Sequence, residues 1–278
     1  MSSASFECFE VSLDDATGVL HVRLNRPKAL NTMTRTFFAE IATVFQTASA
    51  DQRVRCVLLS AAGRMFSAGL DLADASAGLL GTGGADEQPT EHGQVWRAVT
   101  AMQQGFWSVE QCTKPVVSAI HGACLGGALE LVLATDVRFC SADAVFAVRE
   151  TKVAIVADLG MLHRIVRQCG RAWANLLALT GADVSASDAC KAGIVSHVFA
   201  TQEELMARAK EVAVSIAANS PLTVQGVKHV MAFSAEHTPE DALKYVALWN
   251  QSFLRNPDLS EAMQAFFEKR KPLFNARL

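Results

Sequence analysis

His121-Gly-Ala-Cys-Leu-Gly-Gly-Ala-Leu-Glu130 sets the architecture of this chain. The segment follows an apolar run, Val116–Ile120, that predicts a buried strand, and it leads into a predicted helix from Gly126 to about Thr135. Backbone N–H groups in the first turn of a helix have no intrahelical acceptor and lie at the positive end of the helix dipole. This glycine-containing turn therefore suits an anionic oxygen.

A second glycine-containing turn has the same position relative to a strand. Met65-Phe-Ser-Ala-Gly-Leu-Asp-Leu72 follows Val54–Ser60, a second predicted buried strand. If the two turns lie side by side, they supply two N–H donors to one oxyanion. Taken alone, each turn is better explained as a structural connection.

The rest of the chain predicts a mixed α/β region followed by helices. The first part contains a hairpin, Phe9–Leu13 with Val19–Leu24, and an amphipathic helix from about Thr34 to Ala48. Ala73–Gly93 is rich in Ala, Gly and Asp and predicts a surface loop, either a lid over a site or an idle connection. We expect residues 1–200 to form the core and residues 201–278 a helical region. The helices predicted there are Glu203–Asn219, Leu222–Ser234, Pro239–Leu254 and Ser260–Lys271.

Composition excludes several classes of protein. The 278 residues are 50% apolar and 19% charged, as in globular proteins, and the net charge of −3 disfavours nucleic-acid partners. The seven cysteines form no Cys-x-x-Cys pair, which favours a reducing compartment. The histidines lack ligand spacing, and no apolar run is long enough for a membrane span. We therefore expect no metal site, no nucleic-acid partner and no membrane partner.

Three carboxylates lie in apolar surroundings, where burial raises a carboxyl pKa toward the range of a general acid or base. These are Glu130, Glu150 and Asp158. Structural roles are equally compatible with the local sequence. Asp158 could be the N-cap of the helix that follows it, and either glutamate could pair with an arginine such as Arg138 or Arg149.

Five motifs in order resemble the enoyl-CoA hydratase/isomerase (crotonase) superfamily. The resemblance runs from about residue 10 to residue 271. It implies a spiral of ββα units, a C-terminal helical trimerisation region and a homotrimer or homohexamer. It also implies an acyl-CoA thioester substrate without a metal or redox cofactor. The motifs are Asn25-Arg-Pro-Lys-Ala-Leu-Asn31, Phe66-Ser-Ala-Gly-Leu-Asp71, Lys114-Pro-Val-Val-Ser-Ala-Ile-His-Gly122, Gly126-Gly-Ala-Leu-Glu130 and Ser220-Pro-Leu-Thr-Val-Gln-Gly-Val-Lys228.

The resemblance also implies roles for individual residues. The oxyanion donors would be the N–H groups of Ala68 and Gly127. Phe266 and Lys269 would reach the CoA of a neighbouring subunit. The residues expected along the substrate are Lys28, Ala68, Gly69, Leu70, Asp71, Leu72 and Gly126.

The carboxylates separate the activities within the superfamily. Glu130 and Glu150 match the two glutamates of a hydratase, but Ile155-Val-Ala-Asp-Leu-Gly160 resembles the Ala-Asp-x-Gly signature of Δ3,5-Δ2,4-dienoyl-CoA isomerases. The offset from Glu150 to Asp158 (158 − 150 = 8) and the segment Leu243–Ser252 resemble those isomerases as well. One departure is Glu130, where they typically carry Asp.

The resemblance therefore predicts an isomerase of fatty-acid β-oxidation that converts 3,5-dienoyl-CoA to 2,4-dienoyl-CoA. Its reaction takes a proton from C2 and returns one at C6, roughly 5 Å away. We expect Asp158 and Glu150 to divide these transfers, with the assignment of ends open, while Glu130 tunes them or holds water. The alternatives are a 2-enoyl-CoA hydratase using Glu130 and Glu150, and a non-catalytic acyl-CoA-binding or RNA-binding member of the superfamily.

The last three residues, Ala276-Arg277-Leu278, resemble the small–basic–Leu tripeptide that the peroxisomal import receptor recognises. A chance ending would look the same. We expect a peroxisomal location, with the cytosol as the fallback.

Overall fold

The computed structural model describes residues 5–78 and 89–275. A six-stranded sheet in the order β1-β2-β3-β4-β6-β9 forms its centre. β1 pairs with β2 antiparallel, and each later neighbour pairs parallel. The strands are β1 (Phe9–Asp14), β2 (Val19–Leu24), β3 (Cys56–Ala61), β4 (Val116–Ile120), β6 (Val137–Ser141) and β9 (His197–Phe199).

A second, three-stranded sheet lies beyond the ends of β4 and β6. It has the order β5-β7-β8, in which β5 pairs parallel with β7 and β7 antiparallel with β8. The strands are β5 (Ala123–Leu125), β7 (Val145–Ala147) and β8 (Val184–Ser185). β5 was not predicted, because three residues before a glycine turn are too few to show a period.

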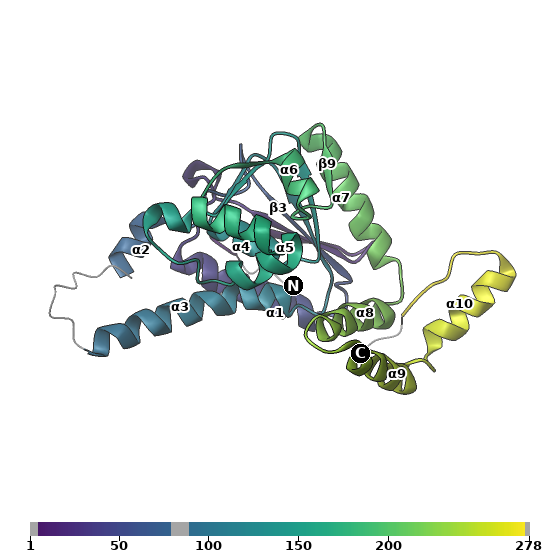
Figure 1. Ribbon diagram of the computed structural model, residues 1–278. Helices are drawn as coiled ribbons and strands as arrows, with labels where there is room; N and C mark the ends of the chain where they lie inside the picture. Colours follow the sequence, from purple (N-terminus) through teal and green to yellow (C-terminus); the bar gives the residue numbers. More distant parts are fainter. Residues whose placement is uncertain (1–4, 79–88, 276–278) are drawn as a thin grey trace.

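The two faces of the large sheet are covered by different helices (Figure 1). On one face, apolar residues of the strands pack with α1 (Arg35–Ala50), α3 (Pro89–Glu110) and α4 (Gly127–Leu133) in the main core. On the other face, a smaller core of β3, β4 and β6 side chains packs against α7 (Gln202–Ala217). This two-sided burial explains why all six residues of β3 are buried and why it reads as a continuous apolar run.

The predicted hairpin and first helix are confirmed. β1 alternates exposed and less exposed residues, as expected for an edge strand with one face on the core. α1 begins after Thr34, whose side chain accepts a hydrogen bond from the Phe37 N–H, and its buried stripe includes Ile41 and Phe45.

The remaining elements of the core are α2 (Leu72–Gly78), α5 (Met161–Thr180), α6 (Ala186–Lys191) and the short 3-10 turns η1 (Pro27–Ala29) and η2 (Glu150–Val153).

The predicted loop Ala73–Gly93 is wrong at both of its ends. Residues 73–78 belong to α2, and residues 89–93 belong to α3. Two local signals explain the helices: Asp71 Oδ1 accepts the Asp74 N–H at 3.2 Å, and α3 starts at a proline, which suits the first turn of a helix. The middle of the expected loop, residues 79–88, lies outside the described residues.

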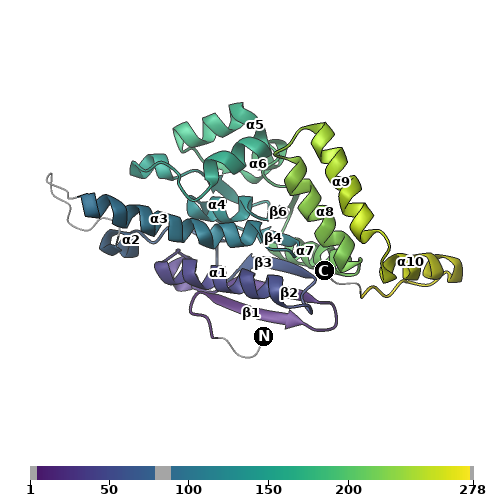
Figure 2. The ribbon, with the colours of Figure 1, turned by 90° about the horizontal axis from the view of Figure 1, so that it is seen from below.

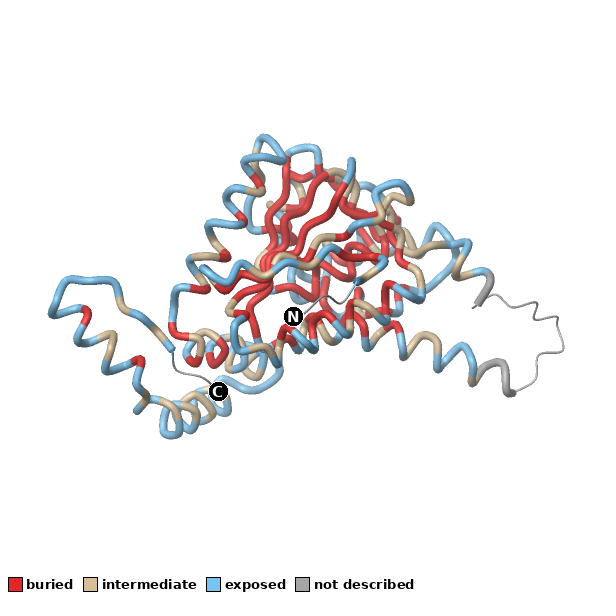
Figure 3. Tube along the Cα trace, turned by 180° about the vertical axis from the view of Figure 1, so that it is seen from behind, coloured by how far each residue is buried: buried red, intermediate tan, exposed pale blue. Residues whose placement is uncertain are grey.

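Three helices extend away from the core at its C-terminal end (Figure 2). They are α8 (Pro221–Ser234), α9 (Pro239–Phe253) and α10 (Pro257–Glu268). Most of α9 and α10 is exposed or half-buried, whereas the strands are buried (Figure 3). α7 packs on the sheet and so lies with the core. The division of the chain at residue 200 stays a prediction.

Candidate active site

The two glycine turns lie against each other. Ser67 and Cys124 form a parallel bridge, with the Ser67 N–H donating to the Ala123 carbonyl at 3.0 Å. Gly69 has φ +88°, and a Cβ there would lie 2.5 Å from the Leu125 carbonyl oxygen and 3.4 Å from the backbone nitrogen of Gly127. Only glycine permits both this backbone conformation and this approach.

Two backbone N–H groups at this junction have no acceptor among the described residues, those of Leu70 and Gly127. A Cβ built on Gly127 would lie 3.9 Å from the Leu70 nitrogen, so the two donors are close together. The expectation for Ala68 is wrong, because its N–H donates to the Leu30 carbonyl at 3.0 Å. The free donor of this turn is two residues later.

Asn31 holds the first turn in place. This side chain is buried, and its Nδ2 donates to the carbonyls of Ala62 at 2.8 Å and Phe66 at 3.0 Å. The Ser67 hydroxyl donates to the Asn31 carbonyl at 2.8 Å. Asn31 lies in the left-handed region with φ 52°, which asparagine tolerates better than most residues. The motif ending at Asn31 therefore fixes the turn that carries Leu70.

Glu130 is a buried carboxyl group at the start of α4. It is 1% exposed, and its Oε2 accepts the Met161 N–H at 3.3 Å. Burial, followed by the negative charges of Glu150 and Asp158, raises the pKa of Glu130 to about 8. Glu130 is therefore mostly protonated at pH 7 and can donate a hydrogen bond.

Glu150 lies beside the turn that supplies the Gly127 donor. Its Oε1 is 3.0 Å from the position that a Cβ on Gly126 would take, and its Oε2 is buried without a hydrogen-bond partner. Burial and the charge of Asp158 raise the pKa of Glu150, while a hydrogen bond from Glu130 lowers it. A buried oxygen without a partner is costly unless a ligand or water satisfies it.

Asp158 lies in the turn between η2 and α5. The residue as a whole is exposed, and partial burial of its carboxyl raises the pKa of that group. The alternative role as an N-cap is wrong, because Gly160 precedes α5 and no side chain caps that helix. The alternative pairings of the glutamates are wrong as well. Arg138 donates to the carbonyls of Ile194 and Thr135, and Arg149 pairs with Asp183.

Comparison with known proteins identifies the family. Residues 14–277 match the family model described as enoyl-CoA hydratase/isomerase. The chain belongs to this family. It is 36% identical to a mitochondrial Δ(3,5)-Δ(2,4)-dienoyl-CoA isomerase of Dictyostelium discoideum over 98% of this chain and 93% of that protein. It is 38% identical to a peroxisomal isomerase of the same name from Arabidopsis thaliana over 99% of each chain.

Solved structures of the family agree with the fold. A crystal structure of enoyl-CoA hydratase from Bacillus anthracis covers 98% of this chain, and this chain covers all of it, with a TM-score of 0.87 and 29% sequence identity. The spiral architecture expected from the sequence is thereby confirmed.

The other expected site residues, Lys28, Asp71 and Leu72, differ in exposure and in their contacts. Lys28 is exposed on η1, whose neighbour Leu30 accepts the Ala68 N–H. Asp71 is occupied within the fold, since it accepts the Thr32 hydroxyl at 2.8 Å and caps α2. Leu72 is 58% exposed at the first position of α2.

Within a single subunit, Phe266 and Lys269 lie outside the site formed by the glycine turns and the carboxyl groups. Both lie at the end of α10, which projects away from α4 and α5 (Figures 1 and 2), and Phe266 is 78% exposed. A role for them in one subunit's own site is therefore not supported by its geometry.

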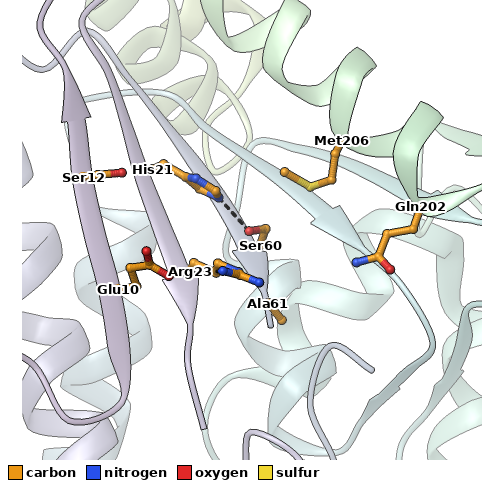
Figure 4. A pocket seen from close by; sticks show the side chains of 8 residues that line it. All are labelled: Glu10, Ser12, His21, Arg23, Ser60, Ala61, Gln202 and Met206. Atoms are coloured by element: carbon orange, nitrogen blue, oxygen red, sulfur yellow. Dashed lines mark hydrogen bonds and ion pairs between the residues drawn. The ribbon is translucent and has the colours of Figure 1, made fainter. Parts of the chain in front are cut away.

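A polar cavity of about 240 Å³ lies on the other face of the sheet, between β1, β2, β3 and α7 (Figure 4). His21 on β2 and Ser60 on β3 form a hydrogen bond of 2.7 Å there. Burial, followed by the charge of Arg23, lowers the pKa of His21. The cavity shares no lining residue with the turns or carboxylates described above.

The described residues contain neither a cluster of metal-ligating side chains nor a membrane-spanning helix. In residues 5–78 and 89–275, no three His, Cys, Asp or Glu side chains gather in a way that could hold a metal ion. Within the same ranges, no helix combines the length and the apolar character needed to cross a bilayer.

Proposed function

We propose that this chain is a Δ3,5-Δ2,4-dienoyl-CoA isomerase. One observation carries the proposal: two free backbone N–H groups converge next to a set of three carboxyl groups whose pKa values are all raised. The family membership and the names of the relatives support the same reaction.

The thioester oxygen binds between the N–H groups of Leu70 and Gly127. Negative charge grows on this oxygen when a proton leaves C2, and donors placed in advance stabilise that charge without reorganisation. Removing one such donor typically costs a factor of about 10² to 10³ in kcat. Gly127 adds the positive end of the α4 dipole to its hydrogen bond.

Two carboxylates then move the protons. Asp158 takes a proton from C2, which delocalises the electron pair over the diene and the thioester, and Glu150 gives a proton to C6. The double bonds move from C3 and C5 to C2 and C4, so the reaction is balanced without water or an oxidant. The opposite assignment of the two ends uses the same residues. We propose that no metal or redox cofactor takes part.

Glu130 supports this chemistry as a neutral acid. With its pKa near 8, it carries a proton at pH 7 and donates it in a hydrogen bond to Glu150. That bond stabilises the carboxylate that is left on Glu150 after its proton has gone to C6, and it restrains the group beside Gly126.

Hydration of 2-enoyl-CoA is a second candidate, because the carboxyl groups of Glu130 and Glu150 shift each other's pKa. The two reactions respond differently to Glu130→Gln. The amide keeps a donor toward Glu150, so isomerisation should persist, whereas a hydratase that needs the Glu130 carboxylate should lose activity.

The coenzyme and the assembly complete the proposal. Lys28 and the turn 68–72 line the CoA, and Phe266 and Lys269 contact the CoA of a neighbouring subunit in a homotrimer or homohexamer. Exposed apolar side chains on the three C-terminal helices support an assembly, since contiguous apolar surface favours burial between subunits. They include Met231, Leu243, Leu248, Met263, Phe266 and Phe267.

We further propose a peroxisomal location. One relative is named peroxisomal, and others are named mitochondrial, so an organelle is the coarser inference. The tripeptide Ala276–Leu278 on which the peroxisomal assignment and the import receptor depend lies outside the described residues. A fluorescent fusion carrying this C-terminus, compared with one lacking the last three residues, tests the assignment.

The proposed activity is tested by offering the purified protein a 3,5-dienoyl-CoA and, separately, a 2-enoyl-CoA. Growth of the ultraviolet absorbance of the conjugated 2,4-dienoyl thioester from the first substrate supports the isomerase. Loss of the enoyl absorbance from the second substrate alone would make the protein a hydratase. Tight binding of CoA without either reaction would indicate a non-catalytic member.

A further inference from the structure

The turn that carries Asp158 is held through its backbone. Gln103 of α3 donates from Nε2 to the Asp158 carbonyl at 2.6 Å, and Arg164 of α5 donates from Nη1 to the Leu159 carbonyl at 3.0 Å. Among the described residues, no other residue donates a hydrogen bond to the Asp158 carboxylate itself. The position of this carboxylate therefore depends on where its backbone is fixed.

Arg164 is itself fixed by α3. It is 5% exposed in its side chain, and its Nε and Nη2 donate to Glu110 Oε2 at 2.9 and 2.6 Å. Gly160, at φ +108°, lies directly against it, since a Cβ there would be 1.9 Å from Arg164 Nη1. A buried, multiply bonded guanidinium is a rigid support, because breaking it would leave a charge buried without its partner.

The segment before the turn offers little other support. Residues 151–156 are exposed, among them Val153 at 46% and Val156 at 74%. A cavity of about 460 Å³ lies between the turn and part of α3, and its lining includes Asp158, Gln103 and Trp107. The turn is thus open on two sides, and the two donors from α3 and α5 bridge it to the core.

We propose that Gln103 and the Arg164–Glu110 pair are positioning residues that hold the Asp158 carboxylate in reach of the substrate. The inference rests on the proposed isomerase function and concerns the placement of its acid–base group. Small displacements of a catalytic group are costly, since a shift of about 1 Å can lower a rate about a hundredfold.

The test compares Gln103→Leu with Gln104→Leu. Leucine keeps the approximate size of glutamine and removes the donor, and Gln104 lines the same cavity without a hydrogen bond to the turn. We expect Gln103→Leu to lower kcat for the 3,5-dienoyl-CoA about tenfold, with KM within about twofold and the melting temperature unchanged. Gln104→Leu should match the wild type in all three quantities.

A double-mutant cycle separates positioning from a general structural role. In an Asp158→Asn background, Gln103→Leu should cost less than about twofold, because there is no longer a carboxylate to place. If the residual rate falls below detection, the comparison of Gln103→Leu with Gln104→Leu in the wild-type background decides the matter. A second variant, Arg164→Lys, keeps the charge beside Glu110 but has one donor group. It should lower kcat while KM and the melting temperature stay within the limits expected for Gln103→Leu.

Equal losses with and without the Asp158 carboxylate would overturn the inference, as would Gln103→Leu behaving like Gln104→Leu. Either result leaves the proposed function intact, provided that the wild type forms the 2,4-dienoyl product. If the wild type does not form that product, both the function and the inference fail.

Discussion

Glu130 makes the stability of this protein depend on pH in a predictable direction. Burial and two neighbouring carboxylates raise its pKa from 4.5 to about 8 in the folded chain. In the unfolded chain the group ionises near its ordinary pKa. Deprotonation therefore lowers the free energy of the unfolded state at a lower pH than it lowers that of the folded state. Glu130 therefore costs no stability below about pH 4.5, and the folded state loses stability as the pH rises toward 8.

The size of the effect follows from the difference in pKa. One pKa step corresponds to about 1.4 kcal/mol, so the shift at Glu130 corresponds to on the order of 5 kcal/mol between pH 4 and pH 9. Glu130→Gln removes the titration and preserves the contacts, since the amide oxygen can accept the Met161 N–H and the amide nitrogen can donate to Glu150. We expect the variant to be more stable than the wild type at pH 9 and to differ little from it at pH 4.

The assay is urea-induced unfolding of both proteins at several pH values and one fixed protein concentration, because assembly would otherwise shift the midpoint. The difference between the two unfolding free energies reports the titration of Glu130 together with its coupling to Glu150 and Asp158, which are present in both proteins. Glu203→Gln, at an exposed position in the first turn of α7, is the matched control and should follow the wild type. A difference for Glu130→Gln that stays constant from pH 4 to pH 9 would refute the reasoning.

Three further predictions concern the turns and the remote cavity. Asp158→Asn should lower kcat for the 3,5-dienoyl-CoA by about 10² or more, and an unchanged rate in the absorbance assay would contradict its role. Gly69→Ala should lower both kcat and the melting temperature, at a cost of about 1–3 kcal/mol, because the position has φ +88° and its Cβ would meet the Leu125 carbonyl at 2.5 Å; a fully active, equally stable variant would show that the turns do not need this approach. His21→Asn in the cavity of Figure 4 should leave kcat/KM within about twofold, and a tenfold loss would mean that this cavity takes part in the reaction.

Local patterns in the sequence predicted most of the fold. The alternation in β1, the apolar runs of β3 and β4 and the amphipathic stripe of α1 each reflect a period that burial imposes. The helices flanking residues 79–88 were missed, because the small residues in the sequence 73–93 suggest a loop and outweigh the local capping signal of Asp71.

The candidate site was predictable as a set of carboxylates, but not in its contacts. Glycine spacing indicates a turn with free donors, yet it does not tell which N–H is used within the fold, and Leu30 takes the one on Ala68. Gln103 and Arg164 were missed because the sequence does not show which side chains bond to the backbone around Asp158. Gln103 is distant from Asp158 in the sequence, and an irregular turn separates Asp158 from Arg164. No local motif marks such partners.

Isomerisation in D2O, followed by mass spectrometry and NMR of the product, tests the central claim most directly. If two carboxylates transfer the protons between the ends of the diene, the 2,4-dienoyl-CoA differs from the substrate only in the positions of its double bonds and in a deuterium at C6. A carboxyl group that exchanges with solvent delivers this deuterium. A product that has gained the elements of water, or the return of unchanged 3,5-dienoyl-CoA, would contradict the assignment of this chain as a dienoyl-CoA isomerase.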